Sequence, residues 1–252
     1  MKVTILGCGT SGGVPRIGNE WGACDPNEPK NRRRRCSILV EDKGTQVLID
    51  TSPDIREQLL DAGVTDLDGV VWTHEHADQC HGIDEIRVLT IRNRRRMDVW
   101  GDDATLNVLM DRFDYCFKQL DGSPYPAILK PHWIEGPFSV GNIDFIPFRQ
   151  DHGSIHSLGF RMGDIGYSND LVNLDDRGFE ILEGIDTWIV DAMRYKPHPT
   201  HVNVETALKW IERLKPRRAI LTNMHVDLDY QTLKRELPDG VEPAYDGMVI
   251  TV

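Results

Sequence analysis

The residues best suited to chemistry stand directly after a short apolar run. Residues 70–72 lead into T-H-E-H-A-D at 73–78, so two histidines and an aspartate follow at every second position. Alternate side chains at the end of a strand point the same way, which would let His74 and His76 bind one metal ion together. Asp78 is then placed to reach a neighbouring ion or a water on the first. The spacing predicts a metal site at the end of a strand.

Two histidines do not complete a catalytic metal site, so further ligands must come from elsewhere in the chain. Candidates follow in order, most of them just after an expected strand, and they are His152, Asp170, His201 and His225. Each of them alone is typical of an ordinary core or surface position. Their succession along one strand-rich chain favours the interpretation that they converge.

The elements that must position these residues are short and irregularly alternating. β-Branched segments predict strands at 2–6, 37–41, 45–49, 69–72, 138–140, 143–148, 158–162, 187–190, 219–221 and 248–252. Helices are expected at 53–62, 104–119, 177–182, 204–214 and 230–236, the fourth capped by Asn203. No linker or repeat divides the chain, so residues 1–252 are expected to form one domain. The pattern favours two sheets with helices outside over a regular parallel array.

A glycine-rich segment at 7–12, G-C-G-T-S-G, has the spacing of a dinucleotide-binding loop. Such a fold needs a helix to begin there, and the glycines and proline that follow at 13–22 cannot readily propagate one. We therefore reject the dinucleotide interpretation. The backbone N–H groups of Gly9, Thr10 and Ser11 remain candidates for binding a phosphate without a helix.

The charge balance restricts the partners. The 252 residues carry 29 Lys and Arg against 40 Asp and Glu, a net charge of −11, which argues against coating long nucleic acid or an acidic membrane. No apolar run approaches the roughly 18 residues of a membrane span. A local phosphate site is still available in the arginine run 32–35, where Arg34 and Arg35 are the candidate ligands. The five scattered cysteines predict free thiols and a cytoplasmic protein.

The ordered pattern resembles a known family. T-H-x-H-x-D after a strand, then a histidine, S-x-D at 168–170 and a last histidine are similar to the metallo-β-lactamase fold. G-C-G-T-S-G-G-V-P at 7–15 and R-R-R-R-C-S at 32–37 resemble a narrower group within it. That group holds tRNase Z-like phosphodiesterases and the cyclic-phosphate phosphodiesterase of the bacterial phosphonate pathway. The resemblance covers essentially the whole chain and implies a four-layer αββα sandwich of class α/β.

The resemblance also implies roles. His74, His76 and His152 would hold a first ion, Asp170 would bridge to a second, and Asp78 would bind that second ion. His201 matches a histidine placed near substrate and leaving group. If only one ion is bound, Asp78 becomes a candidate general base. Histidine and carboxylate ligands suit Zn or Mn, and the sequence does not choose between them.

Two positions depart from the family pattern, and both belong to the second ion. Gln79 stands where H-x-H-x-D-H has its last histidine, and Asn223 replaces the histidine of a closing L-T-H. Each is followed two residues later by another histidine, His81 or His225. One hypothesis is that His225, in an expected loop, rebuilds the second site. The other is that the second site is weak and one ion is firmly held.

The function that these residues predict is metal-dependent hydrolysis. A phosphodiester in a small cyclic ribose phosphate or nucleotide, attacked by a metal-activated water, is the first candidate. A thioester or lactone hydrolase of the same fold, a tRNA 3′-processing nuclease and a metal-binding protein without catalysis are the alternatives. The expected partner is a small phosphorylated sugar or nucleotide, with no membrane and no long nucleic acid, and a homodimer is compatible with the sequence.

Overall fold

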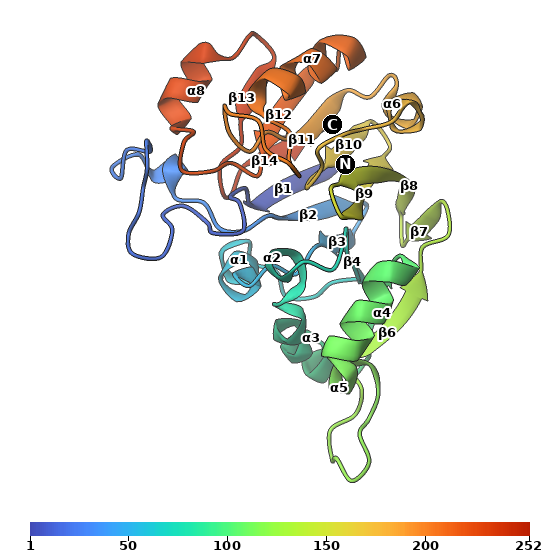
Figure 1. Ribbon diagram of the computed structural model, residues 1–252. Helices are drawn as coiled ribbons and strands as arrows, with labels where there is room; N and C mark the ends of the chain where they lie inside the picture. The colour runs from blue at the N-terminus through green and yellow to red at the C-terminus, as the bar shows by residue number, and fades with distance from the viewer.

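Two seven-stranded sheets face each other in the computed structural model, which describes residues 1–252 (Figure 1). One sheet has the order β14 (Val249–Thr251), β1 (Lys2–Gly7), β2 (Ser37–Asp42), β3 (Thr45–Ile49), β4 (Gly69–Val71), β5 (Met97–Gly101) and β6 (Leu129–Trp133). The other has the order β13 (Val241–Pro243), β12 (Arg218–Thr222), β11 (Thr187–Asp191), β10 (Ile165–Ser168), β9 (Ile155–Met162), β8 (Ile143–His152) and β7 (Phe138–Val140).

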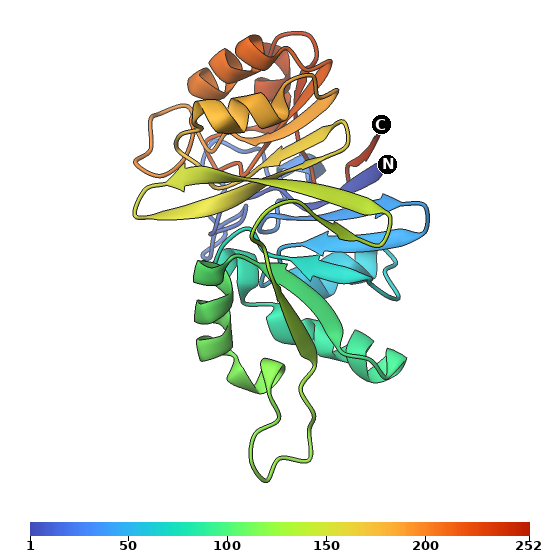
Figure 2. The same cartoon turned by 90° about the vertical axis from the view of Figure 1, so that its right-hand side faces the viewer.

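Helices cover the outer faces of both sheets (Figures 1 and 2). On the side of the first sheet lie α1 (Ile55–Asp61), α2 (Ala77–Cys80), α3 (Arg87–Asn93), α4 (Asp103–Arg112) and α5 (Asp114–Phe117). On the side of the second lie α6 (Asp176–Leu182), α7 (Val204–Leu214) and α8 (Tyr230–Glu236). Two short 3₁₀ turns complete the set, η1 (Pro29–Asn31) and η2 (Ile83–Ile86). The predicted αββα class is confirmed.

Alternation along the strands explains why the sheets are covered on both faces. In β2, Ile38 and Val40 pack into the apolar core between the sheets, whereas Leu39 packs into the core beneath the helices. In β3, Ile49 packs into the core between the sheets and Leu48 into the core beneath the helices. Successive side chains of a strand point to opposite faces, so strands made wholly of apolar residues require a layer on each side.

Most predicted elements match, and the differences have local causes. Helix α7 has the predicted bounds, and the Asn203 side chain accepts a hydrogen bond from the Thr206 N–H at 3.1 Å. The helix expected over 104–119 divides into α4 and α5 because Phe113 leaves the helical region, with φ −128°. Strand β6 was not predicted, and its Pro131 is tolerated because β6 lies at the edge of its sheet.

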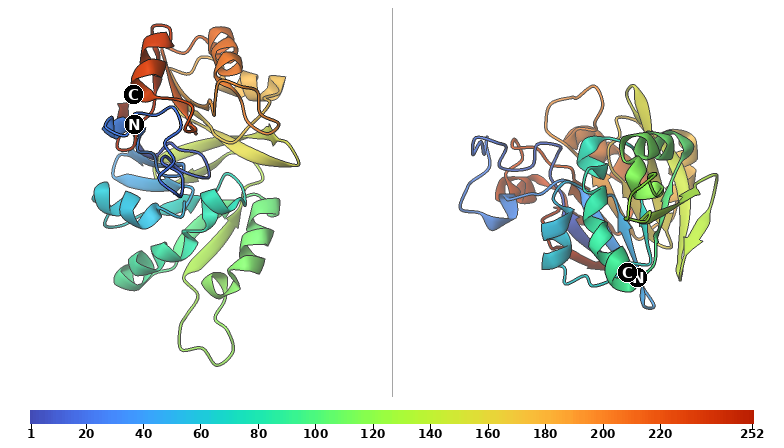
Figure 3. Two further views of the ribbon diagram at one scale, coloured as in Figure 1. Left: turned by 60° about the vertical axis from the view of Figure 1, so that its left-hand side comes forward. Right: turned by 90° about the horizontal axis from the view of Figure 1, so that it is seen from below.

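The segment between β1 and β2 forms loops on one side of the sandwich (Figure 3). No α-helix follows β1 before β2, which agrees with rejecting a dinucleotide site at the glycine-rich segment. The buried Arg33 donates to the carbonyl oxygens of Leu228 at 2.6 Å and His225 at 3.3 Å, and so fastens this segment to the loop after β12. None of the helices has the length and apolar character needed to cross a lipid bilayer.

Strand direction places the candidate residues together. Strands β3, β4 and β5 run parallel to one another, as do β10, β11 and β12, so within each group the carboxyl ends lie at one edge. The two edges meet, because the Leu158 N–H in β9 donates to the Thr73 carbonyl after β4 at 2.9 Å. Ligands in open α/β sheets bind beside such ends.

Candidate metal centre

Three imidazole rings converge where β4 and β8 end. His74 and His76 lie in the loop between β4, which ends at Val71, and α2, and His152 is the last residue of β8. The ring centroids lie 4.7 Å apart for His74 and His76, 5.1 Å for His74 and His152, and 5.0 Å for His76 and His152. One ligand atom from each ring lies within 4.8 Å of the other two. The two sheets therefore bring the predicted first ligand group together.

Hydrogen bonds at Nδ1 hold the rings of His74 and His152 with their Nε2 atoms directed towards the group. His152 Nδ1 lies 2.9 Å from the Thr200 carbonyl oxygen and His74 Nδ1 lies 3.0 Å from Thr73 Oγ1, whereas His74 Nε2 is buried without a hydrogen-bond partner. His152 Nε2 faces His76 Nδ1 at 3.2 Å. Two nitrogens bound to one Zn²⁺ in tetrahedral geometry lie about 3.3–3.4 Å apart, so the residues fit a metal ion.

The protonation states of these rings also suit metal binding. Burial, reinforced by the neighbouring His152, holds the pKa of His74 well below its ordinary value. Burial together with His201 lowers the pKa of His152 to about 4. Both rings are therefore neutral at neutral pH, and a neutral imidazole is the form that binds a metal.

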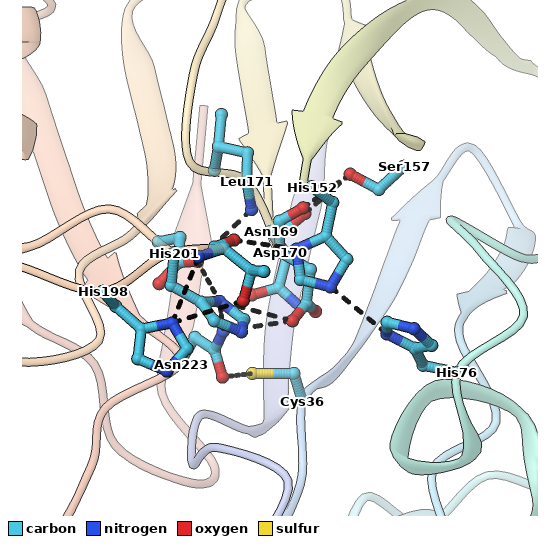
Figure 4. Close-up of polar contacts among 12 residues, drawn as sticks. Cys36, His76, His152, Ser157, Asn169, Asp170, Leu171, His198, His201 and Asn223 are labelled. Atoms are coloured by element: carbon cyan, nitrogen blue, oxygen red, sulfur yellow. Dashed lines mark hydrogen bonds and ion pairs between the residues drawn. The ribbon is translucent and has the colours of Figure 1, made fainter. Parts of the chain in front are cut away.

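A second group lies beside the first and consists of His152, Asp170 and His201 (Figure 4). Asp170 follows β10 and is almost fully buried. His201 Nδ1 lies 2.9 Å from Asp191 Oδ2 and 3.6 Å from Asp170 Oδ1. Burial by itself lowers the pKa of His201, but the carboxylates of Asp191 and Asp170 outweigh it and raise that pKa to about 9. His201 is thus a cation at neutral pH, held next to the metal group.

Asp50 is linked to the first histidine group through Thr73, which precedes His74 in the chain. It follows β3, is fully buried, and accepts hydrogen bonds from the Thr73 N–H at 2.8 Å and the Thr73 hydroxyl at 2.9 Å. Burial raises the pKa of Asp50 to about 8, although the bonds from Thr73 oppose the rise. This arrangement fixes the Thr73 hydroxyl against the His74 ring and so orients a candidate ligand.

Asp78 lies in the first turn of α2 and is half-buried. Its Oδ2 accepts a hydrogen bond from the Gln79 amide at 3.3 Å, and the same amide donates to Asp170 Oδ2 at 2.8 Å. Gln79 thus joins the two carboxylates that were predicted to face a second ion. The roles of Asp78 as ligand and general base stay predictions.

Neither of the two groups contains His225, so the hypothesis that it rebuilds a second site stays a prediction that this geometry does not support. His225 Nδ1 lies 3.0 Å from Asp227 Oδ1, and its N–H donates to the Met193 carbonyl at 2.9 Å. His81, the other displaced histidine, is exposed and packs edge-on against Phe113 at 5.5 Å.

The predicted substrate-binding segments are engaged in structural contacts. The N–H groups of Gly9 and Thr10 donate to the carbonyl oxygens of Arg34 at 2.8 Å and Met224 at 3.4 Å. A Cβ at Gly9 would lie 2.9 Å from Arg33 Cβ, so close packing accounts for this glycine. Ser11 is exposed.

Arg34 and Arg35 bind carboxylates rather than presenting free guanidinium groups. Arg34 pairs with Asp246 at 3.1 Å and with Asp61 at 2.8 Å, and Arg35 Nε lies 2.9 Å from Asp54. None of these pairs joins them to the histidines. They line a hollow of about 490 Å³ whose four acidic residues balance its arginines. Their part in binding a phosphate, like that of Gly9, Thr10 and Ser11, stays a prediction.

Asp191 and Asp50 are the site residues that the sequence did not single out. Each stands at or just after the carboxyl end of a buried strand, in W-I-V-D and V-L-I-D. The same position identified His74, so the signal was present. A lone aspartate there is common, however, and only its long-range partners distinguish it from an ordinary turn residue.

Comparisons with known proteins agree with this geometry. Residues 45–224 match the model of the beta-lactamase superfamily domain. The crystal structure of a diphosphatase from the PhnP family is 34% identical, covers 99% of this chain and 96% of its own, and superposes with a TM-score of 0.92. The short form of human tRNase Z is 18% identical, covers 100% and 99% of the two chains with a TM-score of 0.70, and shares the fold.

One curated relative carries a different name. An octanoyltransferase from Porphyromonas gingivalis is 33% identical over 256 residues, which is 98% of this chain and 51% of that protein. The chain spans about half the length of the curated relatives it matches. The family match covers most of the chain and contains the first histidine group and Asp170, and the chain belongs to the beta-lactamase superfamily.

Proposed function

We propose that this hydrolase of the metallo-β-lactamase fold cleaves a phosphoester or diphosphate bond in a small phosphorylated sugar or nucleotide. The observation that carries the proposal is the position of His201, whose Nδ1 lies 2.9 Å from the buried Asp191 and whose ring centroid lies 4.9 Å from that of His152. The name of the 34% identical relative, a diphosphatase, supports the same bond type. The free cysteines support a reducing, cytoplasmic setting.

When bound, a divalent ion supplies Lewis acidity and lowers the pKa of water to about 7. His74, His76 and His152 would hold it, with Asp170 as a further carboxylate ligand. In this proposal Asp78, whose Oδ2 accepts a hydrogen bond from the Gln79 amide at 3.3 Å, takes a proton from the attacking water. His201 then donates a proton to the departing oxygen.

The protonated histidine distinguishes phosphoester from thioester substrates. A thiol has a pKa of about 8.5, so a thiolate leaves without receiving a proton. The alkoxide that leaves from a phosphoester is far more basic and needs one, so this argument favours the phosphoester over the diphosphate bond, whose leaving phosphate has a pKa of about 6. A histidine with its pKa raised to about 9 keeps that proton available at neutral pH.

A second candidate function follows from the octanoyltransferase relative. The 33% identity with this relative over nearly the whole chain favours an acyl substrate, such as a medium-chain thioester, for the present chain. This chain corresponds to half of that protein, so the acyl chemistry need not reside in the matching half.

A hydrolysis panel separates the candidates. Metal-reconstituted protein is tested on bis-p-nitrophenyl phosphate, a 2′,3′-cyclic nucleotide, a cyclic ribose phosphate, a nucleoside diphosphate sugar, an octanoyl thioester and a lactone. We expect turnover of one or more phosphate substrates, and loss of it in His74→Ala. Turnover confined to the thioester or lactone would refute the proposal, and so would cleavage of precursor tRNA in preference to every small substrate.

A further inference from the structure

We propose that this chain binds one metal ion, in the group formed by His74, His76 and His152, and that side-chain amides fill the place of a second. The inference concerns the number of ions and is independent of the substrate. It rests on the hydrogen bonds around Asp170, the carboxylate that would have to bridge two ions.

Gln79 directs the hydrogen atoms of its amide group, rather than a lone pair of its oxygen, at the carboxylates where a second ion would bind. The side chain is fully buried, and its amide nitrogen lies 2.8 Å from Asp170 Oδ2 and 3.3 Å from Asp78 Oδ2. Two carboxylates on one side require the NH₂ end of the amide to point towards them, because an amide oxygen there would be repelled by both. An amide nitrogen has no lone pair available for a metal. The Gln79 oxygen is buried elsewhere without a partner.

Asn223 presents itself to the same carboxylate in the same way. Its amide nitrogen lies 3.3 Å from Asp170 Oδ1 and 3.2 Å from His201 Nδ1. Its oxygen is on the opposite side of the amide, 3.9 Å from the Cys36 sulfur (Figure 4). The two positions where the family pattern has histidine thus carry donors aimed at Asp170.

Counting lone pairs shows that Asp170 has no capacity to bridge. A carboxylate offers about four acceptor sites, two on each oxygen. Oδ2 accepts from the Gln79 amide at 2.8 Å and from the Asn169 amide at 2.6 Å, which fills it. Oδ1 accepts from Asn223, which leaves about one site for an ion on the side of His152. Asp170 is therefore suited to be a ligand of one ion.

The displaced histidines do not compensate. His225 lies against Asp227, and His81 is exposed beside Phe113. Asp78 is then the remaining candidate ligand for a second ion, and one carboxylate without imidazole partners does not make a Zn site. The residues fit one ion and do not fit two.

The test measures metal stoichiometry and needs no substrate. Protein freed of metal with a chelator is dialysed against Mn²⁺ or Zn²⁺, and bound metal is determined by elemental analysis. We expect close to one ion per chain in the wild type and in His225→Ala, and none in His74→Ala. Electron paramagnetic resonance of the saturated Mn²⁺ form should show an isolated six-line signal.

A restoring variant provides the matched comparison. Gln79→His with Asn223→His replaces the two donors by ligands, and histidine is among the residue types that accept the left-handed backbone of Asn223, φ 57°. We expect close to two ions per chain and an exchange-coupled Mn²⁺ spectrum in the folded variant. Two tightly bound ions in the wild type, a coupled spectrum there, or an ion that survives His74→Ala would overturn the inference. If the double variant does not fold, the wild-type count still decides.

Discussion

The ion pair between His201 and Asp191 allows a quantitative test of how a buried carboxylate controls a nearby proton. Asp191 is fully buried and its Oδ2 lies 2.9 Å from His201 Nδ1. Burial alone would lower the pKa of His201, so its value of about 9 depends on the negative charges around it. The change Asp191→Asn removes the nearest charge while it keeps the size of the side chain.

We expect the pKa of His201 in Asp191→Asn to fall from about 9 to its ordinary 6.5 or below. That decrease of about 2.5 pH units corresponds to about 3 kcal/mol in favour of the neutral ring. The sign follows because a raised histidine pKa reports stabilisation of the cation, and that stabilisation is lost with the carboxylate. His201 would then be neutral at pH 7.5, where the wild type is protonated.

The assay is an NMR titration of histidine ring protons in the metal-free protein, with His201 assigned by its absence in His201→Ala. Asp227→Asn is the matched control, because Asp227 lies 3.0 Å from a different histidine, His225, and should leave His201 titrating near pH 9. In the metal-loaded enzyme, Asp191→Asn should slow poor leaving groups most at pH 7–8.5. A His201 resonance that still titrates near pH 9 in Asp191→Asn would refute the electrostatic reasoning.

Three further changes have defined outcomes. His201→Ala should keep its metal by elemental analysis but lower kcat by roughly 10²–10⁴ on alkyl phosphoesters, with a smaller loss on p-nitrophenyl esters. Equal losses on both would remove the acid role. Thr73→Val deletes the hydroxyl beside the first ligand ring and should weaken metal binding about 10–100-fold in isothermal titration calorimetry. Gly82→Ala places a Cβ against the carbonyl oxygen of Ser52 and should cost about 1–3 kcal/mol in urea unfolding, whereas Gly136→Ala, with open space around it, should cost much less.

The ligands that the sequence predicted well are those that short-range spacing determines. His74 and His76 were expected to alternate at a strand end; β4 ends at Val71 and both lie in the loop after it, yet their rings meet at 4.7 Å because only one residue separates them. His152 ends β8, and its meeting with them follows once two facing sheets are expected. Short-range spacing depends only on neighbouring residues, and here it was enough to predict most of the first histidine group.

The residues that the sequence placed less well depend on partners far along the chain. Arg34 was expected to bind phosphate, yet its carboxylate partners lie 27 and 212 residues away, at Asp61 and Asp246. A run of arginines gives no indication of such partners. His225 was predicted to be a metal ligand because it follows a strand end by three residues. Such a spacing in a loop does not determine where a side chain points, and in the structure the His225 Nδ1 lies 3.0 Å from Asp227 of the same loop.

Three residues near the strand ends of the site share a left-handed backbone conformation. Asp50 and Asn223 each follow a strand directly, Asp170 comes two residues after β10, and all three have a positive φ, of 65°, 57° and 55° respectively. Such a residue costs of order 1 kcal/mol unless it is glycine, and Asp and Asn tolerate it best. The left-handed turn reverses the chain so that the side chain lies across the sheet edge instead of following the strand outwards.

Asn223 stands where the family pattern has histidine, its backbone is left-handed, and its side chain reaches Asp170. The Asn223 side chain is thus directed at Asp170 and acts there as a hydrogen-bond donor. Gln79 does the same from α2, fully buried and directed at the same carboxylate. Two independent segments that direct amides at one buried carboxylate, without collapse of the surrounding strand ends, indicate that Asp170 must be held in place. A carboxylate fixed in that way can serve one ion and orient the neighbouring His201, which is what the single-ion centre requires of it.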